Sequence, residues 1–344
     1  MRAAFITGHG GNEFVTLGAR PDPKRKPGEV LVRLKAATLN RVDLYMRDSG
    51  AGITHSLPQI MGVDGAGVIE AVDDGEKLLA PGQSVVLHPG LGCRRCEFCR
   101  RGEQVLCTSI QYLGEHRDGT LADFISVPAS NVFPMPSALD YAEAAALSVS
   151  YLTAWRMLFT KARVQPGETV LIFGIGGGVS LAALQLAKLA GARVIVTSRD
   201  SRKLQSAAEI GADEGIDSGS DVAREAMRLT NGRGVDVVIE NVGAKVWPAA
   251  LRSLVRGGRV VTCGATTGDQ PSADLRRVFI RQLQIFGSTL GDLDEFGQLL
   301  TLVTQSGLKP VIDGRHGFHD LHAALDRLEA GRQFGKLAIL VDES

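Results

Sequence analysis

Four of the five cysteines in this chain lie close together, in the stretch CRRCEFCRRGEQVLC. The spacing C-x2-C-x2-C-x7-C is typical of a loop whose four thiolates close a tetrahedral zinc site. Clustered cysteines in a chain without a secretory signal indicate metal or redox chemistry before structural disulfides. An iron–sulfur cluster would use the same ligands, but no neighbouring feature suggests an electron relay. We therefore expect one zinc ion, structural because thiolates fill every position, with the ligands Cys93, Cys96, Cys99 and Cys107.

A second group of residues suited to chemistry is the glycine string in FGIGGGVSLAAL. It follows an apolar strand and opens a helix, where glycines let the backbone approach a pyrophosphate at the helix N-terminus. Gly174 and Gly177 fit the first two places of a G-x-x-G-x-x-G spacing, and Ser180 takes the third. The alternative is a glycine turn without a ligand. The cofactor contacts predicted here are Gly174, Gly176, Gly177, Gly178 and Val179.

The end of the next predicted strand bears on which dinucleotide binds. An NAD-preferring site usually has an acidic residue there to hold the ribose hydroxyls. This strand instead ends Thr197-Ser198-Arg199, with Arg202 and Lys203 close behind. Hydroxyls and cations suit a 2′-phosphate, so we expect NADPH, with contacts from Ser198, Arg199 and Lys203. The alternative is that these charges only solvate the first turn of a helix.

Two patterns of hydrophobicity position these motifs. Up to about residue 136, short strand-like runs are separated by glycine and proline, as in 28–40, 65–72, 83–90 and 121–128, which favours a barrel or sandwich. From about residue 169, apolar strands alternate with helical segments, which indicates βαβ units and a parallel sheet. Helical segments at 294–307 and 320–331 and a strand at 336–341 close the chain. The predicted fold is α/β with two domains.

The four-cysteine lobe ahead of a glycine-loop βαβ domain resembles the medium-chain dehydrogenase/reductase superfamily over essentially the whole chain. The resemblance implies a GroES-like β-barrel catalytic domain at 1–148 and 289–344 and a Rossmann cofactor domain at 149–288. Zinc alcohol dehydrogenases of the superfamily hold a second, catalytic zinc through a Cys, a His and a Cys or acid. The matching places here are Asn40, Val63 and Ser148, which do not make such a site.

The pattern N-x-x-D-x-Y-x-R at residues 40–47 is similar to the quinone oxidoreductase branch, as are MGVDGAGVIEAV and AAALSVSYLTAW. Most members of that branch lack the four-cysteine lobe. The resemblance implies a metal-free NADPH reductase of quinones or α,β-unsaturated carbonyl and enoyl compounds. Asn40 and Tyr45 would stabilise charge on the acceptor oxygen, with Tyr45 or solvent giving the proton, and Asp43 would orient its neighbours or cap a helix. The alternatives are a zinc alcohol dehydrogenase and a non-catalytic NADPH-binding protein.

The resemblance also carries further cofactor contacts onto the ends of later strands and the last strand: Asn241, Gly243, Gly264, Ala265, Ser288, Thr289 and Lys336. Asp64 is interpreted as a satisfied structural carboxylate, His88 as packing under the cysteine loop, and His55 as part of a pocket rim. His316, His319 and His322 are predicted to be surface residues in a polar turn before a helix. Cys263 is expected to be an inert buried thiol.

Composition limits the partners of the chain. Its 344 residues suit two domains, and 38 basic residues balance 38 acidic ones, so no broad attraction to nucleic acid or anionic membrane is expected. No apolar run approaches the ~20 residues of a membrane-spanning helix, and no signal peptide is recognisable. We expect a cytoplasmic protein that binds a small-molecule substrate. The resemblance adds a homodimer, formed by edge pairing of two Rossmann sheets near residues 283–289.

Overall fold

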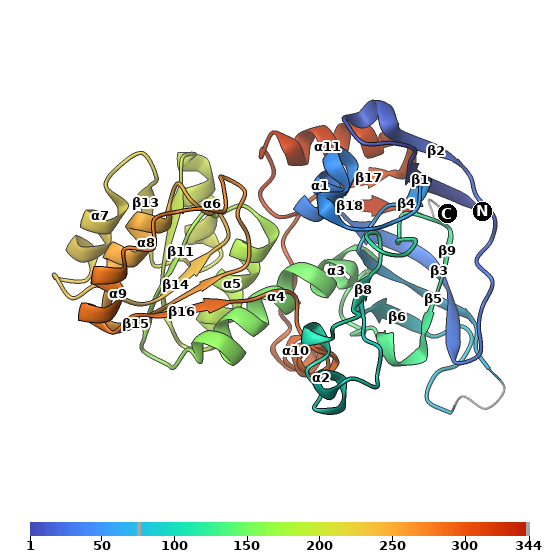
Figure 1. The fold of residues 1–344 in the computed structure, drawn as a ribbon, viewed down its shortest axis with the longest axis horizontal. Coiled ribbons are helices and arrows are strands. Elements are labelled where there is room, and N and C mark those ends of the chain that lie inside the picture. Colours follow the sequence, from blue (N-terminus) through green and yellow to red (C-terminus); the bar gives the residue numbers. More distant parts are fainter. Residues whose placement is uncertain (74–76, 342–344) are drawn as a thin grey trace. The chain divides into compact units, whose positions relative to one another are not determined.

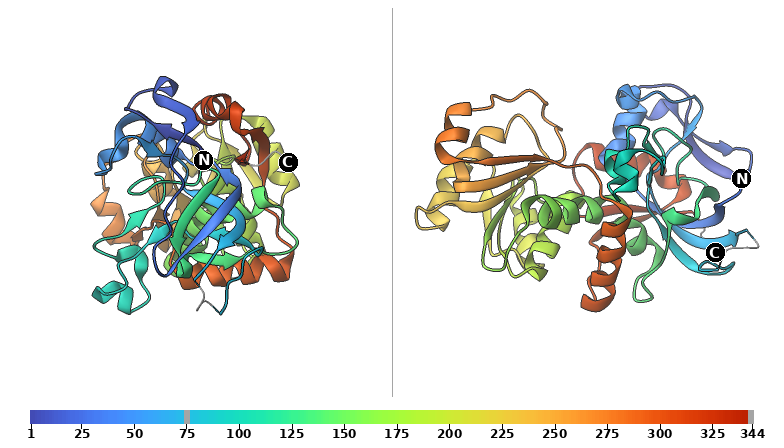
Figure 2. Two further views of the ribbon diagram at one scale, coloured as in Figure 1. Left: turned by 90° about the vertical axis from the view of Figure 1, so that its right-hand side faces the viewer. Right: turned by 60° about the horizontal axis from the view of Figure 1, so that its bottom comes forward.

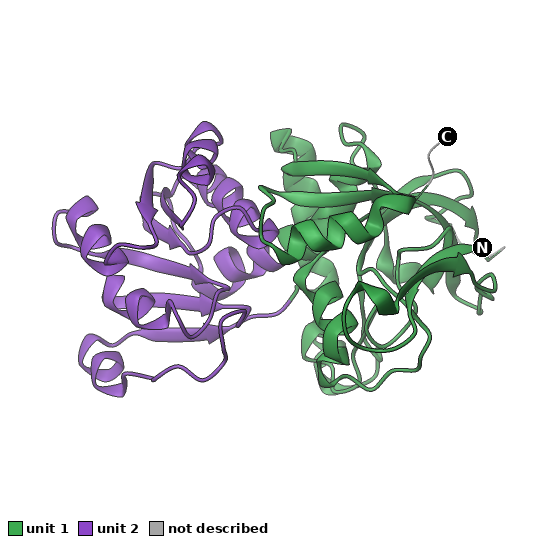
Figure 3. Ribbon diagram, turned by 90° about the horizontal axis from the view of Figure 1, so that it is seen from above, with its two compact units in different colours: residues 1–152, 290–344 green, residues 153–289 purple. Residues whose placement is uncertain are grey.

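The computed structural model describes residues 1–73 and 77–341 and divides the chain into two compact units. Unit 1 comprises Met1–Leu152 and Leu290–Ser344, and unit 2 comprises Thr153–Thr289 (Figure 3). The second unit is therefore inserted in the first. The expected boundaries, after residues 148 and 288, lie slightly upstream of these junctions.

Unit 1 is built around a mixed sheet whose centre is β3 (Glu29–Thr38). Along one edge β3 pairs antiparallel with β5 (Asp64–Ala71); along the other it pairs first with β9 (Phe124–Pro128) and then with β18 (Lys336–Leu340). Residues 28–40 were predicted as a strand, and the second half of β3 is buried on both faces, including Ala36, Ala37 and Thr38. The remaining strands of this sheet are β6 (Ser84–Leu87), β10 (Val132–Pro134) and β17 (Ile312–Gly317).

Smaller sheets and helices complete unit 1 (Figure 1). One sheet joins β2 (Val15–Ala19), β1 (Arg2–Ile6) and β4 (Gln59–Ile60), and another pairs β7 (Gly90–Leu91) with β8 (Gln111–Tyr112). The helices are α1 (Arg41–Ser49), α2 (Glu97–Arg100), α3 (Tyr141–Ala146), α10 (Leu293–Ser306) and α11 (Leu321–Glu329). Two π-helical segments, Leu147–Tyr151 and Arg156–Ala162, flank α4 (Leu152–Trp155), where the chain passes into unit 2.

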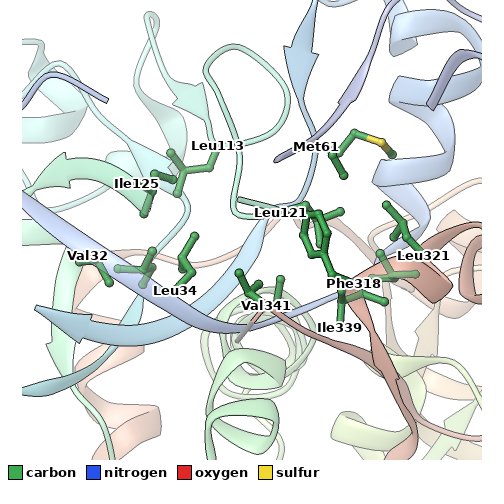
Figure 4. Packing of buried hydrophobic residues seen from close by; sticks show 14 of the residues in the cluster. Val32, Leu34, Met61, Leu113, Leu121, Ile125, Phe318, Leu321, Ile339 and Val341 are labelled. Atoms are coloured by element: carbon green, nitrogen blue, oxygen red, sulfur yellow. The ribbon is translucent and has the colours of Figure 1, made fainter. Parts of the chain in front are cut away.

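The core of unit 1 forms where apolar faces from distant segments meet. Leu34 of β3, Leu121, Phe318 and Ile339 of β18 belong to one buried cluster, shown in Figure 4. Burying such side chains stabilises a fold by roughly 1.5–3 kcal/mol each before entropy is counted. This cluster holds β3 and β18 side by side, and both strands lead into the candidate site.

Unit 2 is a six-stranded sheet in which every neighbouring pair is parallel. In chain order its strands are β11 (Thr169–Ile172), β12 (Arg193–Ser198), β13 (Glu214–Asp217), β14 (Val235–Glu240), β15 (Leu254–Thr262) and β16 (Gln284–Gly287). The spatial order β13-β12-β11-β14-β15-β16 is that of a doubly wound dinucleotide-binding sheet. The α/β fold predicted from the strand–helix alternation is thus confirmed.

Helices connect these strands (Figure 2): α5 (Gly178–Leu189), α6 (Ser201–Glu209), α7 (Val222–Leu229), α8 (Trp247–Ser253) and α9 (Leu275–Arg281). Continuous apolar runs such as TVLI are fully buried in β11, as expected for a central parallel strand. The sheet places the glycine loop after β11, between β12 and β14. Ligands of such folds bind at this change of strand order.

Of the predictions about the last part of the chain, the two helices are confirmed and the position of one histidine is wrong. The predicted helices match α10 and α11 closely. The assignment of His316 to a polar turn is wrong, because it lies in β17, with its Nε2 atom buried. Over the described ranges, no helix is both long and apolar enough to cross a membrane.

Candidate active site and metal centre

The cysteine loop brings its four sulfur atoms together. The Sγ atoms of Cys93, Cys96, Cys99 and Cys107 all lie within 4.8 Å of one another, while zinc–thiolate bonds of about 2.3 Å place tetrahedral sulfurs about 3.8 Å apart. Backbone N–H groups point at these sulfurs: Cys93 N donates to Cys107 Sγ at 3.3 Å and Cys96 N to Cys93 Sγ at 3.4 Å. The N–H groups of Arg95 and Cys96 lower the pKa of Cys93 to about 6. The donor set therefore fits a zinc ion, and it is the only such group among the residues described.

The loop is tied to the start of α10. Asp292 Oδ1 accepts a hydrogen bond from Val105 N at 2.8 Å, and Asp292 N donates to Glu295 Oε2 at 2.7 Å. His88 also supports this junction, since its Nε2 lies 2.9 Å from the carbonyl oxygen of Gly291. His88 is buried, and the polar contacts of its ring are to backbone atoms of Gly90 and Gly291; its packing under the cysteine loop stays a prediction. The cysteine loop is thus hydrogen-bonded to the beginning of a helix far along the chain.

A buried polar network surrounds Asn40 at the N-terminus of α1. Lys336 Nζ donates to Asn40 Oδ1 at 2.5 Å and to Asp64 Oδ2 at 3.0 Å. Asn40 Nδ2 donates to Asp64 Oδ2 at 2.8 Å and to the Thr38 carbonyl at 3.3 Å. Every polar atom of the Asn40 amide therefore has a partner within unit 1. Lys336 is only 3% exposed and joins Asn40 to Asp64 in this network, and its contact with a cofactor stays a prediction.

Strand register explains the network. Thr38 pairs with Ala338 on one side and with Asp64 on the other, so β18, β3 and β5 lie side by side at this level. Two residues further along each antiparallel chain, Lys336 comes opposite Asn40. Residues separated by two positions share one face of a strand, so register alone brings the ammonium, amide and carboxylate together.

The interpretation of Asp64 as a satisfied carboxylate is half wrong. Its Oδ2 atom accepts three hydrogen bonds, including one from Thr38 Oγ1 at 2.5 Å. Its Oδ1 atom is buried and has no hydrogen-bond partner among the described residues. Ser148 Oγ, carried by the π-helical segment that packs near β5, is likewise buried without a partner in the described part of the chain.

Asp43 takes part in the cap of α1, and the pKa of its carboxyl is raised. Its Oδ2 accepts from Asn40 N at 2.7 Å, which confirms the capping interpretation. Burial raises the pKa of Asp43 to about 7, against the lowering by the backbone N–H groups of Asn40 and Gly62 and by Lys336. Asp64 adds a further raising charge. The contact with Asn40 agrees with an orienting or capping role, and the raised pKa adds that this carboxyl is harder to ionise than an exposed one.

Tyr45 lies two residues further along α1 and is 39% exposed. Burial raises the pKa of its hydroxyl, so the group stays protonated at neutral pH. The described residues offer this hydroxyl no hydrogen-bond partner. It is thus a hydrogen-bond donor at the surface of unit 1, on the same helix as Asp43.

Histidines gather next to α1. His55 stacks edge-on against His9 with ring centroids 5.1 Å apart, and both rings pack on Gly50. His9 Nδ1 contacts the Met46 carbonyl at 3.0 Å, and His55 acts electrostatically on His116. His55 was expected at a pocket rim; His9 and His116 were not recognised from the sequence.

In unit 2 the glycine loop has the backbone that a pyrophosphate site requires. Gly174 and Gly176 have φ values of +69° and +112°, and Gly177 precedes the first residue of α5, Gly178. Ser180 is fully buried and donates to the Phe173 carbonyl at 3.0 Å, so its small size does preserve close packing of α5 on β11. The N-terminus of α5, with Val179 in its first turn, offers free N–H groups suited to a phosphate.

Residues predicted at the ends of β14 and β15 converge on this loop. Asn241 Nδ2 donates to Ser180 Oγ at 3.0 Å, and a Cβ on Gly264 would lie 3.0 Å from the Asn241 carbonyl. Gly243, with φ of +95°, packs against Ala265 and Gly268. Asn241, Gly264 and Ala265 therefore form one turn cluster.

Glu240, which the sequence analysis missed, holds that cluster in place. It is fully buried, and its Oε1 accepts from Gly243 N at 2.6 Å while Oε2 accepts from Thr262 Oγ1 at 2.9 Å. Burial and the nearby Glu240 charge raise the pKa of Cys263 to about 12, which supports an inert thiol. After β16, Ser288 donates its backbone N–H to the Thr262 carbonyl, whereas its Oγ is buried and has no partner among the described residues. Such an orphaned hydroxyl next to Thr289 fits a bound cofactor amide.

The basic residues at the end of β12 differ in whether they have hydrogen-bond or ion-pair partners. Ser198 Oγ accepts from Asp200 N at 3.0 Å, and Asp200 caps α6 by accepting from Arg202 N at 3.0 Å. The Arg202 guanidinium turns back onto the Asp200 carboxylate. Arg199 is exposed and makes no hydrogen bond or ion pair within the described ranges, so its guanidinium is available to an anion, with Lys203 on the first turn of α6.

Comparison with known proteins agrees with this architecture. Residues 26–137 match the alcohol dehydrogenase GroES-like domain, and residues 178–305 match the zinc-binding dehydrogenase family. A zinc-type alcohol dehydrogenase-like protein of Schizosaccharomyces pombe is 33% identical over 93% of this chain and 92% of its own length. The chain belongs to the medium-chain dehydrogenase/reductase superfamily.

Solved structures of medium-chain dehydrogenase/reductase proteins superpose closely on this one. A crystal structure described as an NAD-dependent alcohol dehydrogenase has a TM-score of 0.96 and 41% identity, covering 99% of this chain and 100% of that one. A cobalt- and zinc-bound thermostable alcohol dehydrogenase from Pyrobaculum aerophilum has a TM-score of 0.89 and 32% identity over 99% of both chains. The GroES-like and Rossmann fold that the sequence predicted is confirmed, and the protein is an oxidoreductase of this superfamily.

One titratable residue of this medium-chain dehydrogenase/reductase escaped the sequence analysis altogether. Glu115 lies in the loop after β8, next to His116. Burial, followed by the charge of Asp43, raises the pKa of Glu115 to about 7. No sequence signal indicated it, because the motif residues of α1 precede it by some seventy positions and the effect of Asp43 on its pKa arises only in the folded chain.

Proposed function

We propose that this protein is an NADPH-dependent reductase that delivers hydride to a quinone or to an α,β-unsaturated carbonyl or enoyl compound without a catalytic metal. The observation that carries the proposal is the state of the three places where the family's catalytic zinc ligands belong. Asn40 has its whole amide engaged, Val63 is a buried apolar residue, and Ser148 offers a neutral hydroxyl. Zinc sites use thiolates, imidazoles and carboxylates.

Electrostatics support the same proposal. The Asp64 carboxylate, which bonds to Asn40, has the Lys336 ammonium 3.0 Å from its Oδ2 atom. A second cation next to that ammonium would be repelled strongly in a buried setting. Lys336 therefore supplies the buried positive charge that a metal ion would otherwise supply at this site.

The acceptor chemistry follows from the polar groups on unit 1. Bound NADPH supplies the hydride. A conjugated acceptor needs only hydrogen bonds to the oxygen on which charge develops, and the Tyr45 hydroxyl is a protonated, unengaged donor. Asn40 supports this region through the Lys336 and Asp64 network rather than by donating to substrate, because both of its amide hydrogens are used.

Replacement of Tyr45 tests that role. Tyr45→Phe removes the donor, and we expect kcat for acceptor reduction to fall about 10²-fold with little change in NADPH affinity, as for the loss of one oxyanion donor. Steady-state kinetics and NADPH fluorescence titration measure the two quantities. Tyr141→Phe, in α3 with its hydroxyl bonded to Ser84 at 2.9 Å, is the matched control. Equal kcat values for Tyr45→Phe and wild type would remove Tyr45 from the mechanism.

The choice of NADPH rests on Ser198, Arg199 and Lys203 at the end of β12. No acid occupies the tip of that strand, and Asp200 is engaged with Arg202 and the α6 cap. A 2′-phosphate would meet a free guanidinium instead of a carboxylate. The cofactor contacts proposed on unit 2 are otherwise the glycine loop and the turn cluster at Asn241, Gly264, Ala265, Ser288 and Thr289.

We further propose one structural zinc per subunit, bound by the four-cysteine loop, and a homodimer formed through β16. This strand pairs only with β15 among the described residues, so its outer edge is open. The adjoining α9 exposes Leu275 (71%) and Phe279 (68%). An open edge beside exposed apolar side chains favours pairing with a second copy.

The deciding experiment compares acceptors directly. Oxidation of NADPH would be followed with a simple quinone, a 2-alkenal and an enoyl thioester in buffer without added metal. Turnover of any of them, with no oxidation of simple alcohols by NADP⁺ or NAD⁺, supports the proposal. Alcohol oxidation that requires added zinc would instead show a zinc alcohol dehydrogenase. Tight NADPH binding without any turnover would show a non-catalytic binding protein.

A further inference from the structure

A cavity of about 670 Å³ lies in unit 2, at the end of the sheet where its parallel strands begin. Strand register brings the lining segments together, because Arg259 pairs with Val237 on one side and with Gln284 on the other. Four arginines and two carboxylates belong to the lining: Arg233, Arg256, Arg259, Arg281, Glu168 and Asp236. The cavity therefore has more positive than negative charge around it.

Both carboxylates of the cavity are engaged by arginines. Arg233 Nη2 donates to Asp236 Oδ1 at 2.6 Å, and Arg233 Nη1 donates to Asp236 Oδ2 at 2.9 Å. Asp236 Oδ2 also accepts a hydrogen bond from Thr169 N at 2.9 Å. Arg259 forms an ion pair with Glu168. The charges of Arg233 and Arg259 are therefore neutralised, and the excess positive charge of the cavity belongs to the other two arginines.

Arg256 and Arg281 provide that charge. Arg256 Nη1 donates to the Ile280 carbonyl at 3.0 Å, which sets Arg256 beside the residue that precedes Arg281. The other N–H groups of the Arg256 guanidinium have no partner among the described residues. Arg281, half-buried at the end of α9, makes no side-chain hydrogen bond or ion pair within the described part of the chain. Two guanidinium groups on one cavity repel each other, and a bound anion would remove this repulsion.

The backbone next to Arg256 is open to a ligand. The ladder between β14 and β15 shifts register here, so residues 255–258 form a bulge at the cavity. Gly257 in this bulge has a φ of +72°, in the region that favours glycine, and a Cβ there would meet no atom within 4 Å. Bulges re-aim side chains and are frequent next to functional sites. This bulge presents Arg256 to the cavity.

The cavity is separate from the proposed cofactor site. Asp236 lines the cavity, whereas Glu240 holds the turn cluster next to the glycine loop. Both residues lie on β14, and a strand rises about 3.3 Å per residue, so roughly 13 Å separate them along the strand. A dinucleotide is expected at the carboxyl ends of the strands, and the cavity lies at their amino ends. Dinucleotide binding therefore does not account for its arginines.

We propose that this cavity binds the phosphate group of a small phosphorylated organic molecule, held chiefly by Arg256 and Arg281. The planar guanidinium fork matches two phosphate oxygens at once, and such charge-assisted bonds are strong. The volume of the cavity is within the range of small-molecule sites, roughly 300–1,000 Å³, and is larger than a phosphate ion needs. The Gln284 amide, also in the lining, offers polar contacts to the organic part. This site is independent of the proposed reductase function.

Isothermal titration calorimetry of the full-length protein tests this site, with ribose 5-phosphate as the probe and with ribose and inorganic phosphate for comparison. Ribose 5-phosphate is chosen because it lacks the adenine and nicotinamide of the dinucleotide. We expect wild type to bind it, and the double variant Arg256→Gln with Arg281→Gln to bind it at least about tenfold more weakly, because charge-assisted contacts are lost. Ribose, which has no phosphate, should not bind.

The matched control is Arg224→Gln with Arg276→Gln, which removes the same charge from exposed arginines of unit 2 outside the cavity lining. It should keep the wild-type affinity for ribose 5-phosphate. Arg199→Gln, at the proposed 2′-phosphate site, should keep it as well. Thermal unfolding would establish that each variant is folded. If the double variant does not fold, the comparison is made with Arg281→Gln alone, which loses no side-chain contact within the described ranges.

Hydrogen exchange locates the bound probe. Saturation with ribose 5-phosphate should slow exchange in residues 255–259 and 280–284, and not in the glycine loop at 174–180. Equal affinity in wild type and in the double variant, loss of binding in Arg199→Gln, or no binding to wild type at millimolar concentration would each overturn the site. Tighter binding of inorganic phosphate than of ribose 5-phosphate would overturn the organic ligand and assign the cavity to the free ion.

Discussion

Arg199 and Arg202 lie three residues apart at the end of β12, yet their surroundings differ. Arg202 is held by Asp200, whereas Arg199 has no partner among the described residues. A charge-assisted bond to a 2′-phosphate contributes about 1.5–3 kcal/mol. The two residues therefore form a natural pair for testing cofactor preference.

We expect Arg199→Ala to raise the KM for NADPH about 10- to 100-fold and to leave the KM for NADH nearly unchanged. Arg202→Ala is the control and should change the ratio of the two KM values little, because its guanidinium is already engaged. Both values come from steady-state kinetics at fixed ionic strength. A ratio in Arg199→Ala equal to that of wild type would contradict NADPH selection by this residue.

We expect Asp43 to make the stability of the protein depend on pH. Its folded-state pKa of about 7 lies above the unfolded value of 3.8, so the folded state binds more protons between these values. Stability should therefore decrease as pH rises through this window and level off above about 7. In Asp43→Asn, which can still accept the Asn40 N–H bond, the decrease between pH 5.5 and 7.5 should be smaller by about 2 kcal/mol.

Urea unfolding at pH 5.5, 6.5 and 7.5 measures this slope. Asp48→Asn changes an exposed carboxylate on the same helix and is the control. Identical slopes in wild type and Asp43→Asn would show that the Asp43 carboxyl does not titrate in this window.

At the scale of elements, the cysteine loop and the start of α10 behave as one structural piece. They are joined by the Val105–Asp292 bond and by the His88–Gly291 contact. A closed metal site contributes folding free energy directly. Loss of the metal should therefore destabilise both segments.

Removal of zinc with a strong chelator, or Cys96→Ser, should lower the unfolding temperature by at least about 5 °C. Hydrogen exchange should rise in residues 92–109 and 290–296 but not in β11 to β14 of unit 2, which serve as the internal control. Metal content by mass spectrometry accompanies both measurements. Exchange confined to the cysteine loop would show that α10 does not depend on the metal.

At the scale of the whole molecule, the open edge of β16 predicts the oligomeric state. Phe279→Glu together with Ile285→Lys places charges on the exposed apolar surface next to that edge. Charges are a common device against edge-to-edge pairing. We expect the wild type to have the mass of a dimer in light scattering after gel filtration, and the double variant that of a monomer.

Leu17→Glu is the control, since it changes an exposed leucine on β2, a strand of unit 1 rather than of unit 2. It should remain dimeric. A wild-type monomer at micromolar concentration, or a dimer unaffected by the double change, would contradict pairing through β16.

The sequence alone was sufficient to predict features that are formed by residues close together in the chain. The cysteine spacing predicted a loop whose sulfurs do converge, and the glycine string predicted a turn between β11 and α5. Both arise because a few consecutive backbone conformations place the groups, so short-range chain geometry decides them. The alternation of strands and helices similarly predicted the parallel sheet.

Only the tertiary structure determined which side chains from distant segments of the chain lie together. Lys336 meets Asn40 across 296 positions because β18 pairs with β3 in one register and β3 pairs with β5 in another. The loop with Gly114 packs on Gly62, more than fifty positions earlier in the chain. A shift of one residue in either register would turn these side chains to the opposite face. Motif spacing contains no information on such registers; the packing of the unit 1 core selects them.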